Sequence, residues 1–370
     1  MKQPDFHGAK IFGLIAGPVL FAILTLWNPS SSLSSEAWKV IAVAAWMVVW
    51  WITEAAPIAV TALLPIVLFP LTGIFTIDEA TAPYANKIIF LFMGGFMLGL
   101  AMERHNLHKR IALNLIKLTG TNPNGIILGF MLTTAFISMW ISNTATTVMM
   151  LPIGLSIINL LGIDEASEKG KKRFALSLML AIAYGANIGG TATIIGTPPN
   201  VAWVGFMSDM LGTEVTFAKY LTVGIPISLI MLTITYLLIT RVLYPSGIAQ
   251  LSDSAQIIDD QLLALGKITK AEKRVAVIFV STAIAWILRG SLNNWFDTNL
   301  LNDSIIAMTG GILMFITPLE IKKTRFLLEW EYTSRLPWGI LLLFGGGLTL
   351  AKAMEKSDIV QIVGETIAGN

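Results

Sequence analysis

Two uncharged stretches of hydroxyl, amide and glycine residues interrupt long apolar segments of the chain. The first, Ser138–Thr147, reads SMWISNTATT and lies at the centre of the run Gly125–Leu161, which contains no Asp, Glu, Lys, Arg or His. The second, Ala186–Asn200, reads ANIGGTATIIGTPPN and is also uncharged. Proline removes a backbone donor from a helix, and glycine allows the backbone to unwind. We therefore predict that each stretch breaks a helix.

Broken helices of this kind can bind an anion and a cation together. The N-terminal ends of half-helices present unpaired N–H groups and a partial positive charge, which suit anionic oxygens. Unwound carbonyls and the side-chain oxygens of Ser142, Asn143 and Thr144 suit a hard cation such as sodium. Proton coupling would normally use an Asp, Glu or His within the membrane, and neither stretch has one. Sodium is therefore the expected coupling ion.

Each feature by itself also fits ordinary helix packing. A Ser-Asn-Thr sequence in a membrane helix often forms hydrogen bonds between helices, and Gly-Gly often marks the close approach of two helices. Two uncharged breaks on either side of one basic loop, however, form the pattern of transporters whose binding sites lie at the midplane of the membrane. The two breaks together therefore favour a transport site.

The elements that position these stretches are membrane-spanning helices. Hydrophobic residues make up 55% of the chain and charged residues 13%, against about 45–50% and about 25% in soluble domains. A helix needs about 20 apolar residues to cross the hydrocarbon core. The apolar runs that we interpret as spans, several of them extended by flanking residues, are Ile11–Trp27, Trp38–Ile52, Pro57–Phe75, Ile88–Met102, Gly125–Leu161, Phe174–Ser208, Tyr220–Leu243, Ala276–Leu288, Ile305–Ile316 and Trp338–Leu350. The predicted fold class is an all-α polytopic membrane protein, multi-pass in the inner membrane.

The charged and reactive residues exclude several classes of function. A total of 25 Lys and Arg against 23 Asp and Glu gives a net charge of +2, so no overall field attracts nucleic acid. The chain has no cysteine, which excludes disulfides and thiolate metal sites, and its three histidines lack the spacing of a zinc site. No credible pairing of a nucleophile with a histidine is present, so we predict that the chain is not an enzyme. Arg289, at the end of an apolar run, is expected to extend its charged group to the membrane interface.

Basic residues give the orientation because they accumulate in short cytoplasmic loops. Lys2 and Lys10 precede the first span, whereas the loop Asn28–Glu36 has no Lys or Arg, so the N-terminus is expected inside. The basic cluster Lys169–Arg173 also lies inside if Gly125–Leu161 enters and leaves by the same face. Charge alone fits both a re-entrant hairpin and two short crossings. We favour the re-entrant hairpin, because irregular backbone at membrane depth is stable only inside protein or along a cavity.

An internal similarity predicts an inverted repeat. The segment Ile88–Glu103 aligns with Ile340–Glu355 at a constant offset of 252, with nine of sixteen positions identical, including Gly-Gly and Ala-Met-Glu in register. The predicted topology runs the two copies in opposite directions, as in many transporters. The same offset would put a second Ser-Asn-Thr near position 394 and a second Thr-Pro break near 448, past Asn370. We therefore expect an incomplete second repeat, and either a truncated carrier or a natural fragment without transport activity.

Several motifs together resemble the divalent anion/sodium symporter family, in particular its bacterial sodium/dicarboxylate carriers, over nearly the whole chain. The motifs are WWITEAAP at 50–57, APYA at 82–85, SNTATT at 142–147, IGGTAT at 188–193, GTPPN at 196–200 and PWGILLLFGGG at 337–347. The resemblance implies a homodimer in the lipid bilayer that works by an elevator motion of a mobile transport domain against a static scaffold. It also implies two Ser-Asn-Thr tips in each protomer, of which this sequence contains the first.

The resemblance also assigns residues to the site. Ser138, Ser142 and Asn143 would bind sodium together with the Gly196 carbonyl, for which Gly190 is the alternative. The residues that would bind one carboxylate of the substrate are Ser142, Asn143, Thr144 and Thr197.

The domain organisation that we expect follows the same resemblance. Residues 1–118 form scaffold helices of the first repeat, and 119–244 form half of a transport domain with the re-entrant hairpin and the broken helix. Residues 245–274 form a cytoplasmic linker, and 275–370 form scaffold helices of the second repeat, ending before a second hairpin.

The expected function is sodium-coupled secondary transport of small dicarboxylates, such as succinate, malate and fumarate, across the inner membrane. The partners are then sodium ions, the dicarboxylate anion, the lipid bilayer and a second protomer. Two alternatives stay open. One is an exchanger of dicarboxylate, citrate or sulfate from the same family, and the other is a truncated membrane scaffold that does not transport.

Overall fold

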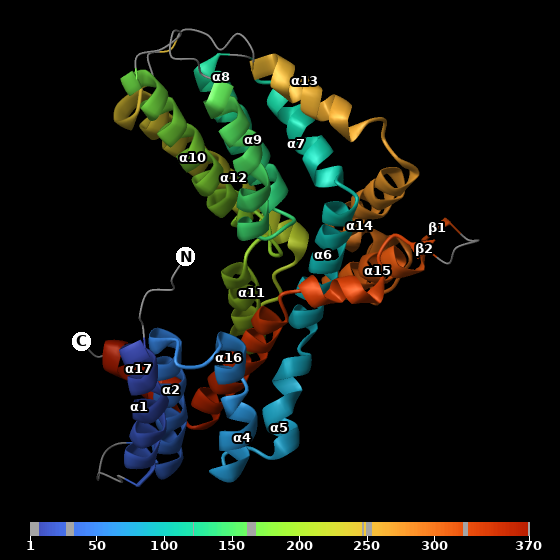
Figure 1. Cartoon of the computed structure of the whole chain (residues 1–370). Helices are drawn as coiled ribbons and strands as arrows, with labels where there is room; N and C mark the ends of the chain where they lie inside the picture. Colours follow the sequence, from blue (N-terminus) through green and yellow to red (C-terminus); the bar gives the residue numbers. More distant parts are fainter. Residues whose placement is uncertain are drawn as a thin grey trace. The chain divides into compact units, whose positions relative to one another are not determined.

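The chain is built almost entirely of helices (Figure 1). The computed structural model describes residues 7–26, 33–120, 122–160, 168–245, 248, 254–320 and 325–368. Lys2, part of the first predicted loop and residues 246–247 and 249–253 of the predicted linker lie outside them. Within these ranges, 5 helices are long and apolar enough to cross a membrane. They are Gly8–Leu26, Ser35–Thr53, Ile77–Arg104, Phe217–Leu243 and Lys270–Trp295. The predicted all-α polytopic fold is confirmed.

The helices form two compact units, the first of which combines both ends of the chain, Met1–Phe90 and Pro337–Asn370. Its elements are α1 (His7–Leu26), α2 (Ser35–Thr53), α3 (Ile58–Thr61), α4 (Leu64–Leu71), α5 (Ile77–Thr81), the 3-10 helix η1 (Ala82–Ala85), the start of α6 (Lys87–Arg104), α16 (Trp338–Lys356) and α17 (Ile359–Ala368). Ser34 caps α2, and Thr76 forms a capping box with Glu79 at the start of α5. The buried hydroxyl of Thr349 on α16 donates to the Ala80 carbonyl at 3.1 Å, which joins α16 to α5.

The second unit spans Leu91–Leu336 and contains both interrupted segments. Its elements after α6 are α7 (Leu107–Lys117), α8 (Pro123–Ser138), α9 (Asn143–Leu160), α10 (Glu168–Gly190), α11 (Pro198–Leu211), α12 (Phe217–Leu237), the π-helical turn η2 (Leu238–Leu243), α13 (Ser254–Leu265), α14 (Lys270–Trp295), α15 (Asp303–Ile316), β1 (Pro318–Glu320), β2 (Arg325–Phe326) and the 3-10 helix η4 (Trp330–Arg335). The strands β1 and β2 pair antiparallel in a small hairpin. The functional division into scaffold and transport parts concerns motion, and it stays a prediction.

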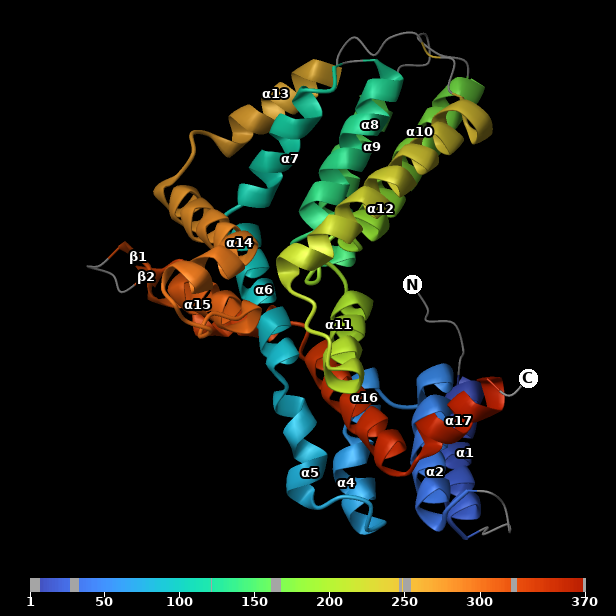
Figure 2. The ribbon, with the colours of Figure 1, turned by 180° about the vertical axis from the view of Figure 1, so that it is seen from behind.

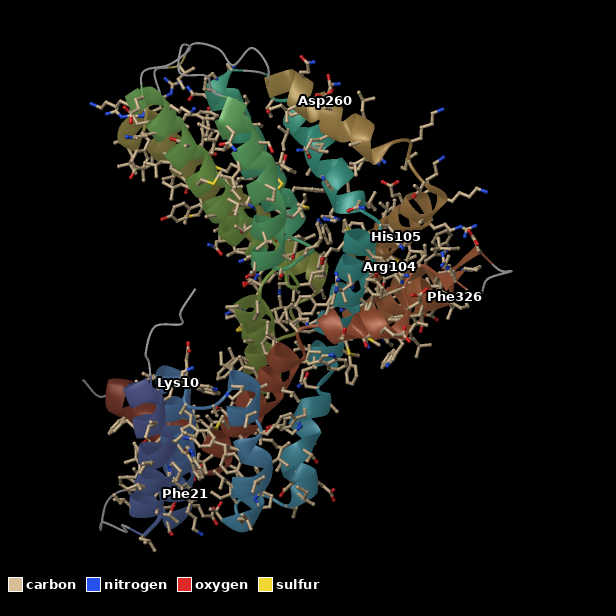
Figure 3. The ribbon with its side chains drawn as sticks, in the orientation of Figure 1. Lys10, Phe21, Arg104, His105, Asp260 and Phe326 are labelled. Carbon is tan, nitrogen blue, oxygen red and sulfur yellow. The ribbon has the colours of Figure 1, made fainter. Side chains whose placement is uncertain are left out.

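Polar contacts join the end of α6 to the segment that follows β2. Arg104 and His105 lie next to each other there (Figure 3). Arg104 pairs with Glu329 at 3.0 Å, and a ring nitrogen of His105 lies 2.8 Å from the Leu327 carbonyl oxygen. On the next helix, α7, Arg110 pairs with Glu272 at the start of α14, with Nε 2.6 Å from the carboxylate. The Arg110 guanidinium also donates to the carbonyls of Leu265 and Gly266, which holds the predicted linker region, where α13 has formed, against α7.

The helices α8 and α10 touch through their backbones. An added Cβ at Gly185 would lie 2.8 Å from the Met131 carbonyl oxygen, and one at Gly189 would overlap the Ala135 backbone. Small residues four apart allow such an approach between membrane helices. This contact sets the distance between the two interrupted segments.

The helices that carry the predicted repeat, α6 and α16, use their matched glycines in the same way. A Cβ at Gly94 would lie 2.5 Å from the carbonyl carbon of Ala307, and one at Gly346 would overlap the carbonyl group of Ala62. Each glycine thus admits a neighbouring backbone inside its own unit. The inverted repeat itself stays a prediction.

Candidate functional site

Both predicted breaks are present in the helices. The helix α8 ends at Ser138 and α9 begins at Asn143, while α10 ends at Gly190 and α11 begins at Pro198. The lower ends of α8, α9 and α10 come together next to the start of α11 in both views (Figures 1 and 2). Two helix N-termini and two helix C-termini therefore meet in one region. Re-entry of the α8–α9 hairpin into a membrane stays a prediction.

Hydrogen bonds within the α8–α9 break gather three of the predicted sodium ligands. The Ser138 hydroxyl donates to Asn143 Oδ1 at 2.7 Å. The Ser142 hydroxyl oxygen accepts from the backbone N–H of Ala145 at 3.3 Å, which caps the first turn of α9. The predicted ligands Ser138, Ser142 and Asn143 thus lie around a single turn of backbone.

The two predicted glycines lie against this turn. A Cβ at Gly190 would overlap Asn143 Oδ1 and lie 3.2 Å from Asn143 Cγ, so only glycine leaves room for the amide. A Cβ at Gly196 would overlap the Gly190 carbonyl oxygen and lie 3.0 Å from its carbon. The structure therefore brings Asn143, Gly190 and Gly196 together, and their role in binding sodium stays a prediction.

The predicted substrate residues differ in exposure. Thr144 is exposed on the first turn of α9, while Ser142 and Asn143 are half-buried. Thr197 is half-buried and precedes α11 in an extended conformation, with φ −148° and ψ 144°, and its side chain makes no capping hydrogen bond. Among the described residues, no hydrogen bond joins Thr144 or Thr197 to the Ser138–Asn143 group. The two threonines flank the turn and are not bonded to it.

Two buried residues that were not singled out from the sequence hold the breaks in place, one between the two breaks and one within the second. The Thr193 hydroxyl donates to the Met139 carbonyl at 2.6 Å, which joins the α10–α11 break to the hairpin tip. The Asn200 amide donates to the carbonyls of Gly190, at 3.0 Å, and Thr193, at 2.7 Å. Both side chains are almost fully buried. Their polarity inside an apolar run was the available signal, because buried polar groups need partners.

A third connection joins Asn143 to α10. Its Nδ2 donates to Asn187 Oδ1 at 3.1 Å. The Asn143 Oδ1 accepts from Ser138, so hydrogen bonds at both the oxygen and the nitrogen fix the orientation of this amide.

The charge of the site comes from dipoles and not from side chains. The residues from Ser138 to Thr147 and from Ala186 to Asn200 contain no ionisable group. The N-termini of α9 and α11 contribute partial positive charge, and the C-termini of α8 and α10 contribute carbonyl oxygens. Such an arrangement can bind a hard cation and a carboxylate next to each other.

Known proteins are similar to this chain along nearly its whole length. A family model described as the sodium:sulfate symporter transmembrane region matches residues 9–370. The sodium-dependent dicarboxylate transporter SdcS of Staphylococcus aureus strain bovine RF122 / ET3-1 is 43% identical over 371 residues, which cover 99% of this chain and 71% of that protein. The same transporter from strain USA300 is also 43% identical, with the same coverage. The version from strain MSSA476 is 42% identical over 371 residues.

Proposed function

Because this chain belongs to the divalent anion/sodium symporter family, we propose that it carries out sodium-coupled secondary transport of small dicarboxylates such as succinate, malate and fumarate. Membership confirms the family predicted from the motifs. It also confirms that the chain is a multi-pass transporter of the inner membrane and not an enzyme. The choice of a dicarboxylate follows the Staphylococcus aureus relatives, which are sodium-dependent dicarboxylate transporters. The observation that carries the proposal is the meeting of four helix ends without an ionisable side chain.

The proposed sodium ligands are the oxygens of Ser138, Ser142 and Asn143 with one glycine carbonyl. The Gly190 carbonyl already accepts a hydrogen bond from Asn200, which favours the Gly196 carbonyl as the ligand. Sodium that binds there adds a full positive charge beside the turn. Coupling then follows from electrostatics, because the ion raises the affinity of the neighbouring position for an anion and the anion raises the affinity for sodium.

The proposed carboxylate position lies at the starts of α9 and α11. Ser142, Asn143, Thr144 and Thr197 supply hydroxyl and amide donors there, and the helix N-termini supply partial positive charge. Thr144 and Thr197 carry no competing hydrogen bond to the Ser138–Asn143 group, so their hydroxyls are available to the anion. As part of the same proposal, a homodimer moves residues 119–244 across the bilayer relative to residues 1–118 and 275–370.

The experiment that tests the function measures succinate uptake into proteoliposomes that contain the purified protein. An inward sodium gradient is expected to drive accumulation that an equal choline gradient does not. Equal uptake under both gradients would contradict sodium coupling. Vesicles preloaded with succinate, citrate or sulfate separate symport from exchange, because an exchanger accumulates label only when it is preloaded. An absence of uptake in every arm would favour the non-transporting scaffold.

A further inference from the structure

A buried carboxylate lies outside the candidate site, at the start of α15. The side chain of Asp303 is 9% exposed, and that of its partner Arg289 on α14 is 14% exposed. The charge of Arg289 is compensated by Asp303 inside the protein, and the interfacial position expected from the sequence stays a prediction. A buried carboxylate in a membrane protein is expensive and commonly has a functional role.

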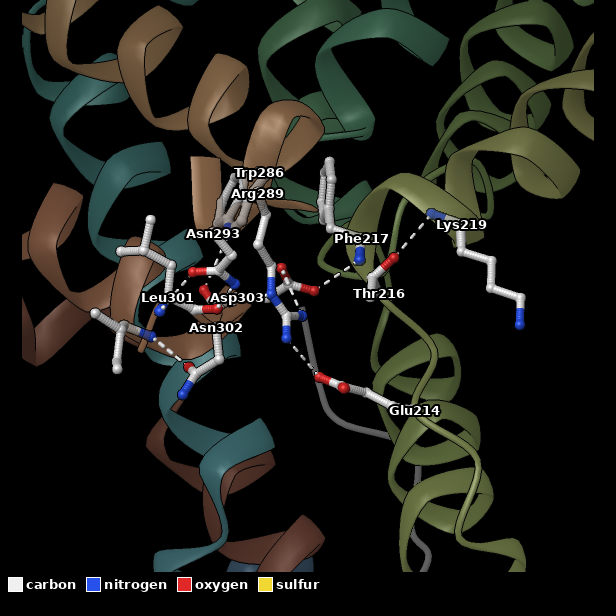
Figure 4. A network of polar contacts seen from close by, with 11 residues as sticks. Glu214, Thr216, Phe217, Lys219, Trp286, Arg289, Asn293, Leu301, Asn302 and Asp303 are labelled. Carbon is white, nitrogen blue, oxygen red and sulfur yellow. Dashed lines mark hydrogen bonds and ion pairs between the residues drawn. The ribbon is translucent and has the colours of Figure 1, made fainter. Parts of the chain in front are cut away.

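Asp303 fixes the first residue of α12 (Figure 4). Its Oδ2 accepts the backbone N–H of Phe217 at 2.7 Å, and its Oδ1 lies 3.4 Å from Arg289 Nη1. The first N–H groups of a helix have no partner within the helix. Asp303 thus supplies that partner from a different helix, by a charge-assisted hydrogen bond.

Arg289 is held by contacts on its other side. Its Nη2 lies 2.8 Å from Glu214 Oε1, in the segment between α11 and α12, and its Nε donates to the Leu301 carbonyl at 2.9 Å. The Glu214 side chain is 56% exposed, whereas Asp303 faces inward. The two carboxylates on Arg289 therefore differ in role, since only Asp303 contacts Phe217.

An aromatic stack continues from this network to the hairpin tip. The Phe217 ring is stacked on Trp286, with centroids 4.6 Å apart, and the Trp286 indole N–H donates to the Asp303 carbonyl at 2.9 Å. Trp140, inside the α8–α9 break, stacks on Phe217 at 6.2 Å and meets the edge of Phe279 at 4.9 Å. The order of contacts is Asp303, Phe217, Trp140, and then the turn that carries Ser142.

We propose that Asp303, with Arg289, is a positioning residue for the hairpin tip. It holds the start of α12 in place, and the Phe217 ring then provides the surface on which Trp140 is seated. In the conformation of this structure, the α8–α9 turn keeps its geometry because Trp140 is clamped between rings of α12 and α14. For its consequence in transport the inference rests on the proposed function, since the turn carries the proposed sodium ligands.

The test uses the absence of native cysteine. A single Ala145→Cys substitution on the first turn of α9 reports access to the tip through its rate of labelling by a water-soluble maleimide. Asp303→Asn keeps the shape of the side chain and removes the charge. We expect it to raise the labelling rate roughly tenfold, as for the loss of one charge-assisted hydrogen bond. An unchanged rate would overturn the proposal.

Two controls distinguish positioning from general loosening. Glu214→Gln removes the charge of the exposed partner of Arg289, and we expect a change in labelling of less than about twofold. A cysteine at Ser177, which is buried on α10, should stay protected in the Asp303→Asn protein. Equal increases in the labelling rate at positions 145 and 177, or equal effects of the Asp303 and Glu214 variants on that rate, would contradict a specific role of Asp303 in positioning the hairpin tip.

A second variant covers the case in which Asp303→Asn does not fold. Phe217→Leu keeps the backbone N–H that Asp303 accepts and removes the ring between Trp140 and Trp286. We expect faster labelling at position 145 here too, and an unchanged rate would count against the stack. All labelling is first measured without sodium or succinate, so the result does not depend on transport. If sodium then fails to protect position 145 in the parent protein, the proposed sodium site fails and the positioning inference stands.

Discussion

Replacing Gly190 with alanine tests the geometry at the centre of the candidate site. The new methyl group would overlap Asn143 Oδ1 and lie 3.2 Å from Asn143 Cγ. Carbon and oxygen atoms prefer separations of about 3.5 Å, so the Asn143 amide has to move by about 1 Å. That movement breaks the 2.7 Å hydrogen bond from Ser138 and turns the amide oxygen away from the proposed sodium ligands.

The expected effect is on sodium dependence. A lost neutral hydrogen bond costs up to about 1.5 kcal/mol, and about 1.4 kcal/mol corresponds to a factor of ten in affinity. We therefore expect the sodium concentration for half-maximal succinate uptake to rise roughly tenfold in the Gly190→Ala protein. Uptake is measured in proteoliposomes over a range of sodium concentrations, at a fixed succinate concentration.

A matched control is available in the same chain. Gly347 is also helical, and a Cβ added to it meets no heavy atom within 4 Å. Gly347→Ala should leave sodium dependence unchanged and stabilise the helix by up to about 1 kcal/mol. If Gly190→Ala kept the sodium dependence of the parent protein, Gly190 and Asn143 would not be neighbours in the working site.

Three further predictions concern contacts around the site and at the end of α6. Thr193→Val removes the donor to the Met139 carbonyl and should weaken apparent sodium affinity in uptake, whereas Thr193→Ser should retain it. Arg110→Ala leaves the buried Glu272 carboxylate without its ion-pair partner and should lower the free energy of unfolding by about 3–5 kcal/mol, measured by thermal unfolding. As a control, Lys172→Ala removes the exposed pair with Glu168 and should leave the free energy of unfolding nearly unchanged. Burial lowers the pKa of His108, so the folded state favours the neutral ring. The buried neutral ring of His108 contributes its full share of stability above the unfolded pKa of about 6.5, and this share is lost as the pH falls below that value. The melting temperature should therefore fall less between pH 7.5 and pH 5.5 in the His108→Asn protein than in the parent protein.

Local sequence signals predicted the elements of the site well. Pro198 and the glycines before it interrupt a helix by a local effect that does not depend on tertiary packing, and the polar turn at Ser142 also interrupts its helix locally. The grouping of Ser138, Asn143 and Gly190 was also predicted, but through resemblance to a family and not through the spacing of the residues.

The contacts that hold the site depend on the three-dimensional packing. Asn200 contacts carbonyls on its own broken helix, and its two acceptors are defined only once the chain has unwound. Asp303 and Phe217 are 86 residues apart, and no local pattern links them. For the same reason the sequence did not reveal the partners of Arg289, because Glu214 and Asp303 come from other elements.

The backbone contact between α8 and α10 has a mechanical consequence. Gly185 and Gly189 leave no room between the facing backbones of α10 and α8. Neither helix can therefore slide along the other unless the two first separate. In any motion of this unit, we therefore expect the hairpin and the broken helix to move as one rigid body. Thinning or stretching of the surrounding membrane would tilt this body as a whole, and the spacing between the two turns would not change.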